Sequence, residues 1–397
     1  MENCKELFKK NKRTIIILAI IILIGIFLRT YNFHDWLRFG HDQARDQWII
    51  SKALEGKNLP LLGPNAGTTA YQLGPIYYYF SYASELLFGN KPDAMAYPSL
   101  FFSILSIPLL FFFLREFFTK NLSLALTSIA SISYFLVINS RFSSNPNLIT
   151  FFILLYLYSL LKIFSNSEEK YKYIWGVLAG IGIGVGIQLH TTLLTAIPLT
   201  TFFAFVYVIF KSKSFKIWKM LLTIILIVLF VNTSQIYHEI KSSGGNTKLF
   251  FKGLEKTSGE KNYGKNIFLI SACQIEANTY MISSIGDDIR CRDVFHQGGK
   301  LYYFGSIVMI FFSVIGYFLL GKKLWQEKDQ KKKNFLGIIL LFNTISFVLL
   351  VPIAKIIYVG YFINLFFVPF ILLGIFFEEF QKKYKTIGKF LALAILT

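Results

Sequence analysis

The sequence predicts an all-α protein whose helices cross a membrane many times, and three observations support this. Of the 397 residues, 54% are hydrophobic, and the mean hydropathy is +0.52. Apolar runs long enough to span a bilayer recur from one end of the chain to the other. The net charge of +19 is carried by lysines clustered in the short gaps between these runs, a distribution typical of membrane proteins rather than of nucleic-acid-binding ones. We therefore expect residues 1–397 to form a single transmembrane domain.

The first apolar run follows a basic tail that contains Lys9, Lys10 and Arg13, and it extends from Ile15 to Leu28. A signal peptide begins in the same way, but this run is too long for one and no small-residue cleavage site follows it. We therefore expect a retained membrane helix with the N-terminus in the cytoplasm and the protein in the cell membrane.

The apolar runs together predict about eleven transmembrane helices. The last run is short for a span. There we expect either a tilted or partial segment, or a chain that continues beyond Thr397. The expected helices lie near residues 14–30, 95–118, 121–140, 147–164, 172–190, 191–210, 218–237, 301–320, 334–352, 356–377 and 387–397.

One aromatic segment, residues 73–88, decides the topology of everything after it. It is apolar enough to cross the membrane, but it contains Glu85 and opens with Gly74-Pro75. If it crosses, the later lysine-rich gaps fall outside, against the rule that short basic gaps face the cytoplasm. We therefore expect a juxtamembrane helix lying in the interface, with its tyrosines at the level of the lipid headgroups. The gaps that then face the cytoplasm are 115–120, 162–172, 211–219, 322–333 and 382–385.

The same topology places three connections on the outer side: a first outer loop, residues 31–94, the turn after residue 140, and a long outer loop, residues 238–300. Cys273 and Cys291 both lie in the long loop, where the compartment allows a disulfide. Two unpaired thiols are the alternative that the sequence leaves open. Three cysteines and five scattered histidines form no zinc-binding spacing.

One helix carries glycines at every fourth position, Gly176, Gly180 and Gly184, with Gly182 and Gly186 between them. In an apolar helix this pattern lets neighbouring backbones approach closely. A dinucleotide-binding loop is the alternative, but no strand precedes these glycines. The pattern therefore indicates helix packing.

The stretch FGHDQARDQ, residues 39–47, holds the densest group of ionisable residues. If it is helical, Asp42, Arg45 and Asp46 share one face. A surface helix with internal ion pairs is the alternative reading, and Asp46 with Arg45 or Lys52 fits it. We favour a functional role for Asp42 because the topology brings other polar residues to the same outer side. Those residues, besides Asp35 and His41 in the first loop, are Ser140, Arg141, Asn145, Asn147, Gln188, His190 and Lys355.

Several stretches resemble the GT-C superfamily of membrane glycosyltransferases, specifically its family 39, which contains protein O-mannosyltransferase-like and aminoarabinose-transferase-like (PMT-like) enzymes. The resemblance covers most of residues 15–375. The stretches that carry it are GHDQARDQWIISKALEGKNLPLLGP, LGPIYYYFSYASELLFG, SRFSSNPNLITFFILLYLYSLL, GIQLHTTLLTAIPL and GYFINLFFVPFILLG.

The resemblance implies a GT-C type fold, a polyprenyl-phosphate-linked sugar donor, an inverting transfer and an active site on the outer face. It marks Asp42 as the catalytic acid/base position. Many relatives have an Asp-Glu pair there, whereas this chain has Asp42-Gln43.

Sugar transfer to a hydroxyl acceptor needs a base, and Asp42 is our candidate. The phosphate leaving group needs cations, and the candidates are Arg45, Arg141 and Lys355. Arg141 as a helix-end anchor and Lys355 as a snorkelling side chain are the alternatives. We expect Tyr78 on the aromatic helix to contact the lipid. The remaining candidate cavity residues are His41, Asn145, Asn147, His190 and Tyr361.

We therefore expect a glycosyltransferase whose partners are a polyprenyl-phosphate sugar, a lipid, glycan or protein acceptor and membrane lipids, and not nucleic acid. We predict no cofactor and assign no metal ligands, although a divalent ion held by an Asp-His pair stays an open alternative. A transporter or flippase of lipid-linked saccharides is the rival function. It would need polar residues at mid-membrane depth, whereas these residues lie at the outer ends of helices. A non-catalytic assembly protein is a third reading, which no feature of the sequence favours.

Overall fold

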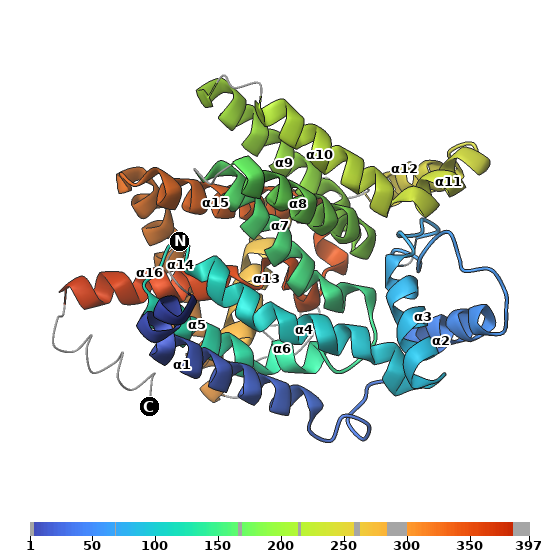
Figure 1. The fold of residues 1–397 in the computed structure, drawn as a ribbon, viewed down its shortest axis with the longest axis horizontal. Coiled ribbons are helices and arrows are strands. Elements are labelled where there is room, and N and C mark those ends of the chain that lie inside the picture. The colour runs from blue at the N-terminus through green and yellow to red at the C-terminus, as the bar shows by residue number, and fades with distance from the viewer. Residues whose placement is uncertain are drawn as a thin grey trace.

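The protein was analysed as a computed structural model that describes residues 4–67, 69–165, 169–212, 216–257, 263–283 and 300–383. In these ranges the fold is helical, with one isolated bridge between Asn65 and Gln72 (Figure 1). This confirms the predicted all-α class. The first six helices are α1 (Cys4–Thr30), α2 (His41–Leu54), α3 (Ile76–Phe88), α4 (Pro92–Leu114), α5 (Lys120–Ile132) and α6 (Tyr134–Asn139).

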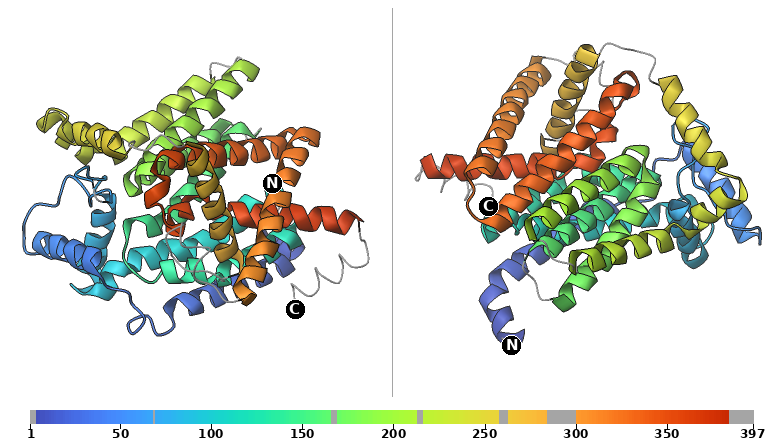
Figure 2. Two further views of the ribbon diagram at one scale, coloured as in Figure 1. Left: turned by 180° about the vertical axis from the view of Figure 1, so that it is seen from behind. Right: turned by 90° about the horizontal axis from the view of Figure 1, so that it is seen from above.

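The long helices form a bundle, and α2 and α3 stand at one end of it beside α11 and α12 (Figures 1 and 2). The middle of the chain contains η1 (Asn145–Leu148), α7 (Ile149–Phe164), α8 (Glu169–Leu189), α9 (Thr191–Ser212), α10 (Lys216–Val231), α11 (Thr233–Lys241) and α12 (Gly245–Thr257). The last part contains α13 (Tyr263–Ser283), α14 (Lys300–Gln326), α15 (Gln330–Leu350), η2 (Val351–Ile356), η3 (Val359–Leu365) and α16 (Val368–Lys383).

Fewer helices qualify as membrane spans than the eleven we expected from the apolar runs. Six described helices are long and apolar enough to cross, or up to eight if each of two bent helix pairs counts as one span. The run 387–397 lies outside the described residues. The difference arises partly because several apolar runs break within themselves, so that a continuous hydrophobic stretch does not become one straight helix.

Each break occurs at a residue whose chemistry favours a helix end. The expected helix 218–237 bends by 67° between α10 and α11, at Asn232, whose side-chain amide donates to the carbonyls of Gly184 and Val228. The expected helix 121–140 divides at Ser133, whose hydroxyl donates to the carbonyl of Met281. Such short polar side chains compete with the helical hydrogen bonds and are common at caps.

The segment 238–300, expected as one long loop, contains two described helices instead, α12 and α13. Cys273 and Ala277 of α13 are fully buried, and α13 packs against η2, η3, α14 and α16. Ile270, Tyr280 and Met281 of α13 belong to the main hydrophobic core of the bundle. Cys273 is disulfide-bonded; Cys291, the partner considered from the sequence, lies outside the described residues. We did not predict α13 as part of the bundle because the segment as a whole is polar.

The glycine-rich helix α8 packs as the sequence predicts. A Cβ atom on Gly180 would lie 2.6 Å from Cβ of Ile227 on α10. One on Gly182, on another face, would lie 2.8 Å from the backbone nitrogen of Tyr156 on α7. Both distances are shorter than a carbon atom tolerates, so α8 lies closely between α7 and α10 because it lacks side chains at these positions.

We expect Gly182→Ala to destabilise the fold by about 1–3 kcal/mol, because the added methyl group meets backbone atoms of α7 that cannot rotate away. Thermal unfolding of the purified protein in detergent would measure this. Gly337→Ala on α15 is the control, because its Cβ would meet nothing within 4 Å, and helix propensity alone should leave it neutral or slightly stabilised. Equal unfolding temperatures for both variants would contradict close packing at Gly182.

Candidate active site

Helix α2 begins directly at the acidic stretch, and Gln43 fixes its first turn. The side-chain oxygen of Gln43 accepts a hydrogen bond of 3.0 Å from the backbone nitrogen of Gly40, which satisfies one of the unpaired N–H groups before the helix. Its amide nitrogen donates to the carbonyl of Ser143, 2.8 Å away. One side chain therefore caps α2 and ties it to the turn after α6.

Asp42 and Asp46 lie on one face of α2, as the spacing predicts, but in opposite environments. The Asp42 side chain is 76% exposed and pairs with Nη1 of Arg45 at 2.9 Å. The Asp46 side chain is 4% exposed and accepts hydrogen bonds of 2.8 Å from Nε of Arg45 and from the hydroxyl of Tyr78. Burial raises the pKa of Asp46, and the charge and hydrogen bonds of Arg45 oppose that rise. Asp46 is thus the buried partner that holds Arg45, while Asp42 remains open to solvent.

Helix α3 supports this arrangement from behind. The hydroxyls of Tyr77 and Ser143 are 2.8 Å apart, and Ser143 also donates to the carbonyl of Met95 at the start of α4. The start of α3 is held by Gln188, whose side-chain oxygen accepts from the backbone nitrogen of Ile76 at 3.1 Å. Gly74 lies against Gln188, since a Cβ atom there would approach to 2.3 Å. The first loop is therefore attached both to the turn after α6 and to the end of α8.

A second group of predicted residues gathers beside that turn. The Asn145 amide donates to the carbonyl of Leu189 at the end of α8, 2.5 Å away. The next residue, His190, faces the ring of Tyr361 edge-on at 5.1 Å between ring centres, and its Nδ1 lies 2.9 Å from the hydroxyl of Thr192. Burial lowers the pKa of His190 to about 4, so its ring is neutral at neutral pH.

Arg141 lies near these residues but does not offer its guanidinium to a ligand. It is 1% exposed, and it donates to the carbonyls of four residues around the end of α1, at 2.8 to 3.2 Å. Its cation also lies over the rings of Phe33 and Trp36. This contact favours the helix-end anchor that the sequence left open as the alternative to a phosphate ligand, because the carbonyls at the C-terminus of a helix already occupy this cation. The four carbonyls belong to Leu28, Arg29, Tyr31 and Asn32.

Two further expectations change in the structure. Tyr78 is 2% exposed and gives its hydroxyl to Asp46, so it holds the carboxylate rather than contacting lipid. Asn147 is 4% exposed, and its amide closes the turn by donating to the carbonyl of Phe142. The side chain of Lys355, within η2, lies outside what the structure describes. His41, in the first turn of α2, is exposed.

The sequence analysis gave no connecting role to Gln43 and Gln188 and missed Ser143 altogether. No motif marks them, because an uncharged side chain that bonds to a backbone carbonyl needs no fixed partner residue. Across the described ranges, no three His, Cys, Asp or Glu side chains gather as metal ligands would.

Comparisons with known proteins agree with this architecture. Residues 72–237 match the family described as dolichyl-phosphate-mannose-protein mannosyltransferase. A curated relative, the undecaprenyl phosphate-alpha-4-amino-4-deoxy-L-arabinose arabinosyl transferase of Wigglesworthia glossinidia brevipalpis, is 28% identical over 201 residues, which is 50% of this chain and 34% of the relative. The chain therefore spans about a third of that relative's length.

Solved structures show the same fold at low sequence identity. ArnT from Cupriavidus metallidurans bound to undecaprenyl phosphate superposes with a TM-score of 0.56 at 12% identity, over 94% of this chain and 60% of that one. The archaeal oligosaccharyltransferase AglB from Archaeoglobus fulgidus, in complex with an inhibitory peptide and a dolichol-phosphate, gives a TM-score of 0.58 at 14% identity, over 96% and 52%.

A helical membrane bundle that superposes on both structures over nearly its whole length is a protein of the GT-C fold. Over the matched segment and the 201 residues shared with the arabinosyl transferase relative, the chain is similar to PMT-like and ArnT-like glycosyltransferases. The matched family segment begins after α2. The match therefore does not include Asp42.

The buried carboxyl of Glu85 on α3 gives a prediction about pH. It is 2% exposed, Gln47 donates to one of its oxygens at 2.8 Å, and its other oxygen has no hydrogen-bond partner. Burial raises its pKa from 4.5 to about 7. The folded protein therefore binds this proton more tightly than the unfolded chain, and stability falls as the pH rises from about 4.5 through 7.

We expect Glu85→Gln to remove that fall, which is worth on the order of 3 kcal/mol at most. Thermal unfolding in detergent between pH 5 and pH 8 is the measurement. Glu55→Gln is the control, because that exposed carboxyl has a lowered pKa and stays ionised over this range. Parallel pH curves for the wild type and Glu85→Gln would show that Glu85 does not titrate there.

Proposed function

We propose that this protein transfers a sugar from a polyprenyl-phosphate carrier to a hydroxyl acceptor, with Asp42 as the base. The observation that carries the proposal is the pair of unlike carboxylates on α2. Asp46 is buried and holds Arg45, which leaves Asp42 exposed with a cation beside it. The family match and the arabinosyl transferase relative support the reaction class.

In the proposed reaction, Asp42 accepts the proton of the acceptor hydroxyl as that oxygen forms a bond to the anomeric carbon. The bond between the anomeric carbon and the phosphate oxygen breaks at the same time. Polyprenyl phosphate leaves with both electrons of that bond, and attack from the opposite side inverts the anomeric centre. Asp42 then returns its proton to water.

Arg45 is our candidate for the donor phosphate. Its guanidinium is 41% exposed, and Asp46 fixes it through Nε and Nη2. Nη1 currently bonds to Asp42. A phosphate oxygen can replace that carboxylate on Nη1, which frees Asp42 to meet the acceptor and offsets the charge of the leaving group. Lys355 stays a second candidate cation.

The acceptor side is proposed at the residues that follow α8. His190, Tyr361 and Asn145 lie together there, and the hydrogen bonds of Gln43 and Asn145 join this group to α2 through the turn 143–147. A neutral His190 offers a hydrogen bond to a sugar or acceptor hydroxyl without attracting the phosphate. The acceptor itself is a lipid, a cell-surface glycan or a protein.

We propose that the site faces the outside of the cell membrane and that the N-terminus lies in the cytoplasm. The lysine-rich gaps of the sequence support this orientation. The disulfide bond of Cys273 supports it too, because disulfides persist in oxidising compartments outside the cytoplasm.

We expect Asp42→Asn to lower sugar transfer by about 100- to 10,000-fold, since the amide cannot accept the acceptor's proton. The assay uses membranes supplied with a panel of labelled polyprenyl-phosphate sugars and endogenous acceptors. Asp35→Asn is the control, because Asp35 is an exposed carboxylate in the same loop and should retain activity. Wild-type turnover by Asp42→Asn with a donor that the wild type uses would refute the role.

We expect Arg45→Lys to lower transfer by about 10- to 100-fold, because a lysine keeps the charge but cannot bond Asp46 and a phosphate at the same time. Initial rates at increasing donor concentration would separate weaker donor binding from slower transfer. Arg38→Lys, an exposed arginine before α2, is the matched control. If the two Arg→Lys variants behave alike, the phosphate role belongs elsewhere.

A further inference from the structure

A buried arginine inside the bundle has no acidic partner. Arg29, in the last turn of α1, is 1% exposed. Its Nε donates to the hydroxyl of Ser103 on α4 at 2.9 Å, and its Nη1 donates to the carbonyls of Gly25 and Ser131. Within the described residues it forms no ion pair, and no partner is found for its Nη2. Burying an uncompensated cation is costly, so its charge needs an explanation.

The surroundings add positive charge instead of removing it. Arg141 is equally buried and donates to the carbonyl of Arg29 itself. Arg141 also forms no ion pair with a described residue, so two cations converge on the end of α1. The carbonyl ends of α1 and α5 supply only about half a negative charge each. They offset about one of the two positive charges.

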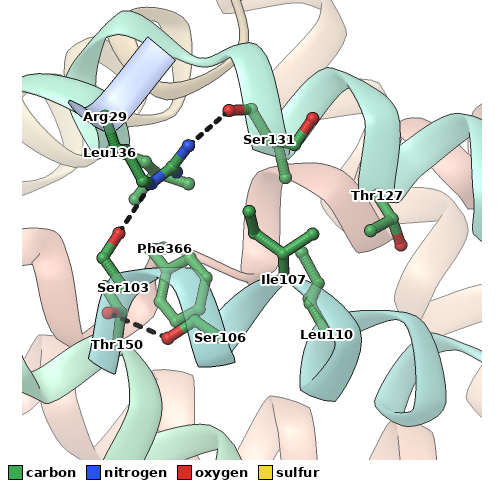
Figure 3. Close-up of a pocket in the computed structure, with 11 residues that line it drawn as sticks. Arg29, Ser103, Ser106, Ile107, Leu110, Thr127, Ser131, Leu136, Thr150 and Phe366 are labelled. Carbon is green, nitrogen blue, oxygen red and sulfur yellow. Dashed lines mark hydrogen bonds between the residues drawn. The ribbon is translucent and has the colours of Figure 1, made fainter. Parts of the chain in front are cut away.

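Arg29 lines a small cavity inside the bundle (Figure 3). Its volume is about 20 Å³, enough for one particle little larger than a water molecule. Serines and threonines from α4, α5 and α7 face it, and Ile107, Leu110 and Phe366 close it with apolar surface. In such surroundings an anion beside the guanidinium is attracted far more strongly than in water.

One hydroxyl at this cavity is free to donate. Ser103 accepts from Nε of Arg29, and among the described residues its own proton has no acceptor. The other hydroxyls are committed: Ser106 donates to the carbonyl of Phe102 at 2.8 Å, so Thr150, 3.3 Å away, donates to Ser106. Thr127 and Ser131 donate to carbonyls of their own helix, those of Ser123 and Ser128. Donors are therefore present on the side of Arg29 and α4.

We propose that this cavity binds a small inorganic anion of the size of chloride, held by Arg29 and by the hydroxyl of Ser103. The ion neutralises Arg29 and joins α1 and α4. The cavity is too small for a phosphate group, so this site is separate from the proposed donor site.

The test measures thermal unfolding of the full chain in detergent, in sodium chloride against sodium gluconate at equal ionic strength. Chloride should raise the unfolding temperature saturably, by about 2–4 °C, and gluconate should not. Equal curves in the two salts would overturn the proposal. Sugar transfer is not part of this readout, so a failure here leaves the proposed reaction untouched, and the reverse also holds.

Two serine variants localise the effect. Ser103→Ala removes the hydroxyl that donates to the ion, so the chloride response should shrink several-fold. Ser131→Ala is the matched control, because its hydroxyl is committed to its own helix, and its response should equal that of the wild type. A response that is the same in both variants would contradict the site. In crystals grown with bromide, an anomalous peak beside Arg29 supports the proposal, and a water only or an empty cavity overturns it.

Discussion

The hydrogen bonds of Arg141 to the carbonyls at the end of α1 determine where the first loop leaves the membrane bundle. A helix ends with carbonyl groups that lack partners, and a buried end must find them elsewhere. Here one arginine from the turn after α6 satisfies several at once. The carbonyl of Ser143 in the same turn accepts a hydrogen bond from the Gln43 side chain. Residues 141–143 therefore hold both the end of α1 and the start of α2. The position of Asp42 depends on this turn.

Two tyrosines of α3 add hydrogen bonds that hold α2 against the turn after α6. Tyr77 reaches Ser143 and Tyr78 reaches Asp46, so the turn and the buried carboxylate are held by neighbouring side chains of one helix. A buried hydroxyl that lost its partner would cost free energy, and each bond therefore resists displacement of the other. Such support matters for a base that must meet a proton within hydrogen-bond distance.

The sequence was sufficient to predict the class of fold and the shared face of Asp42, Arg45 and Asp46 on α2. It was insufficient to predict the hydrogen bonds that connect α2 to the rest of the bundle. Apolar runs reveal a membrane bundle, and glycines spaced by four residues reveal the close packing of α8, because both depend on composition and period. The break at Asn232 and the burial of α13 depend on partners distant in sequence. The contacts of Arg141 and Tyr78 were not predicted for the same reason, because the sequence does not show whether a polar side chain binds a ligand or another part of the chain.

Three arginines near the first loop show how environment separates these roles. Arg141 is occupied by carbonyls, and Arg29 lines a small cavity of about 20 Å³, too small for a phosphate. Arg45 alone among the three is partly exposed. It pairs with two carboxylates, of which Asp46 is buried and Asp42 is exposed. A buried pair is hard to separate, whereas an exposed pair is worth about 1 kcal/mol or less and exchanges readily with another anion. The weak contact between Arg45 and Asp42 is therefore the one that a phosphate can replace, and replacing it exposes the proposed base.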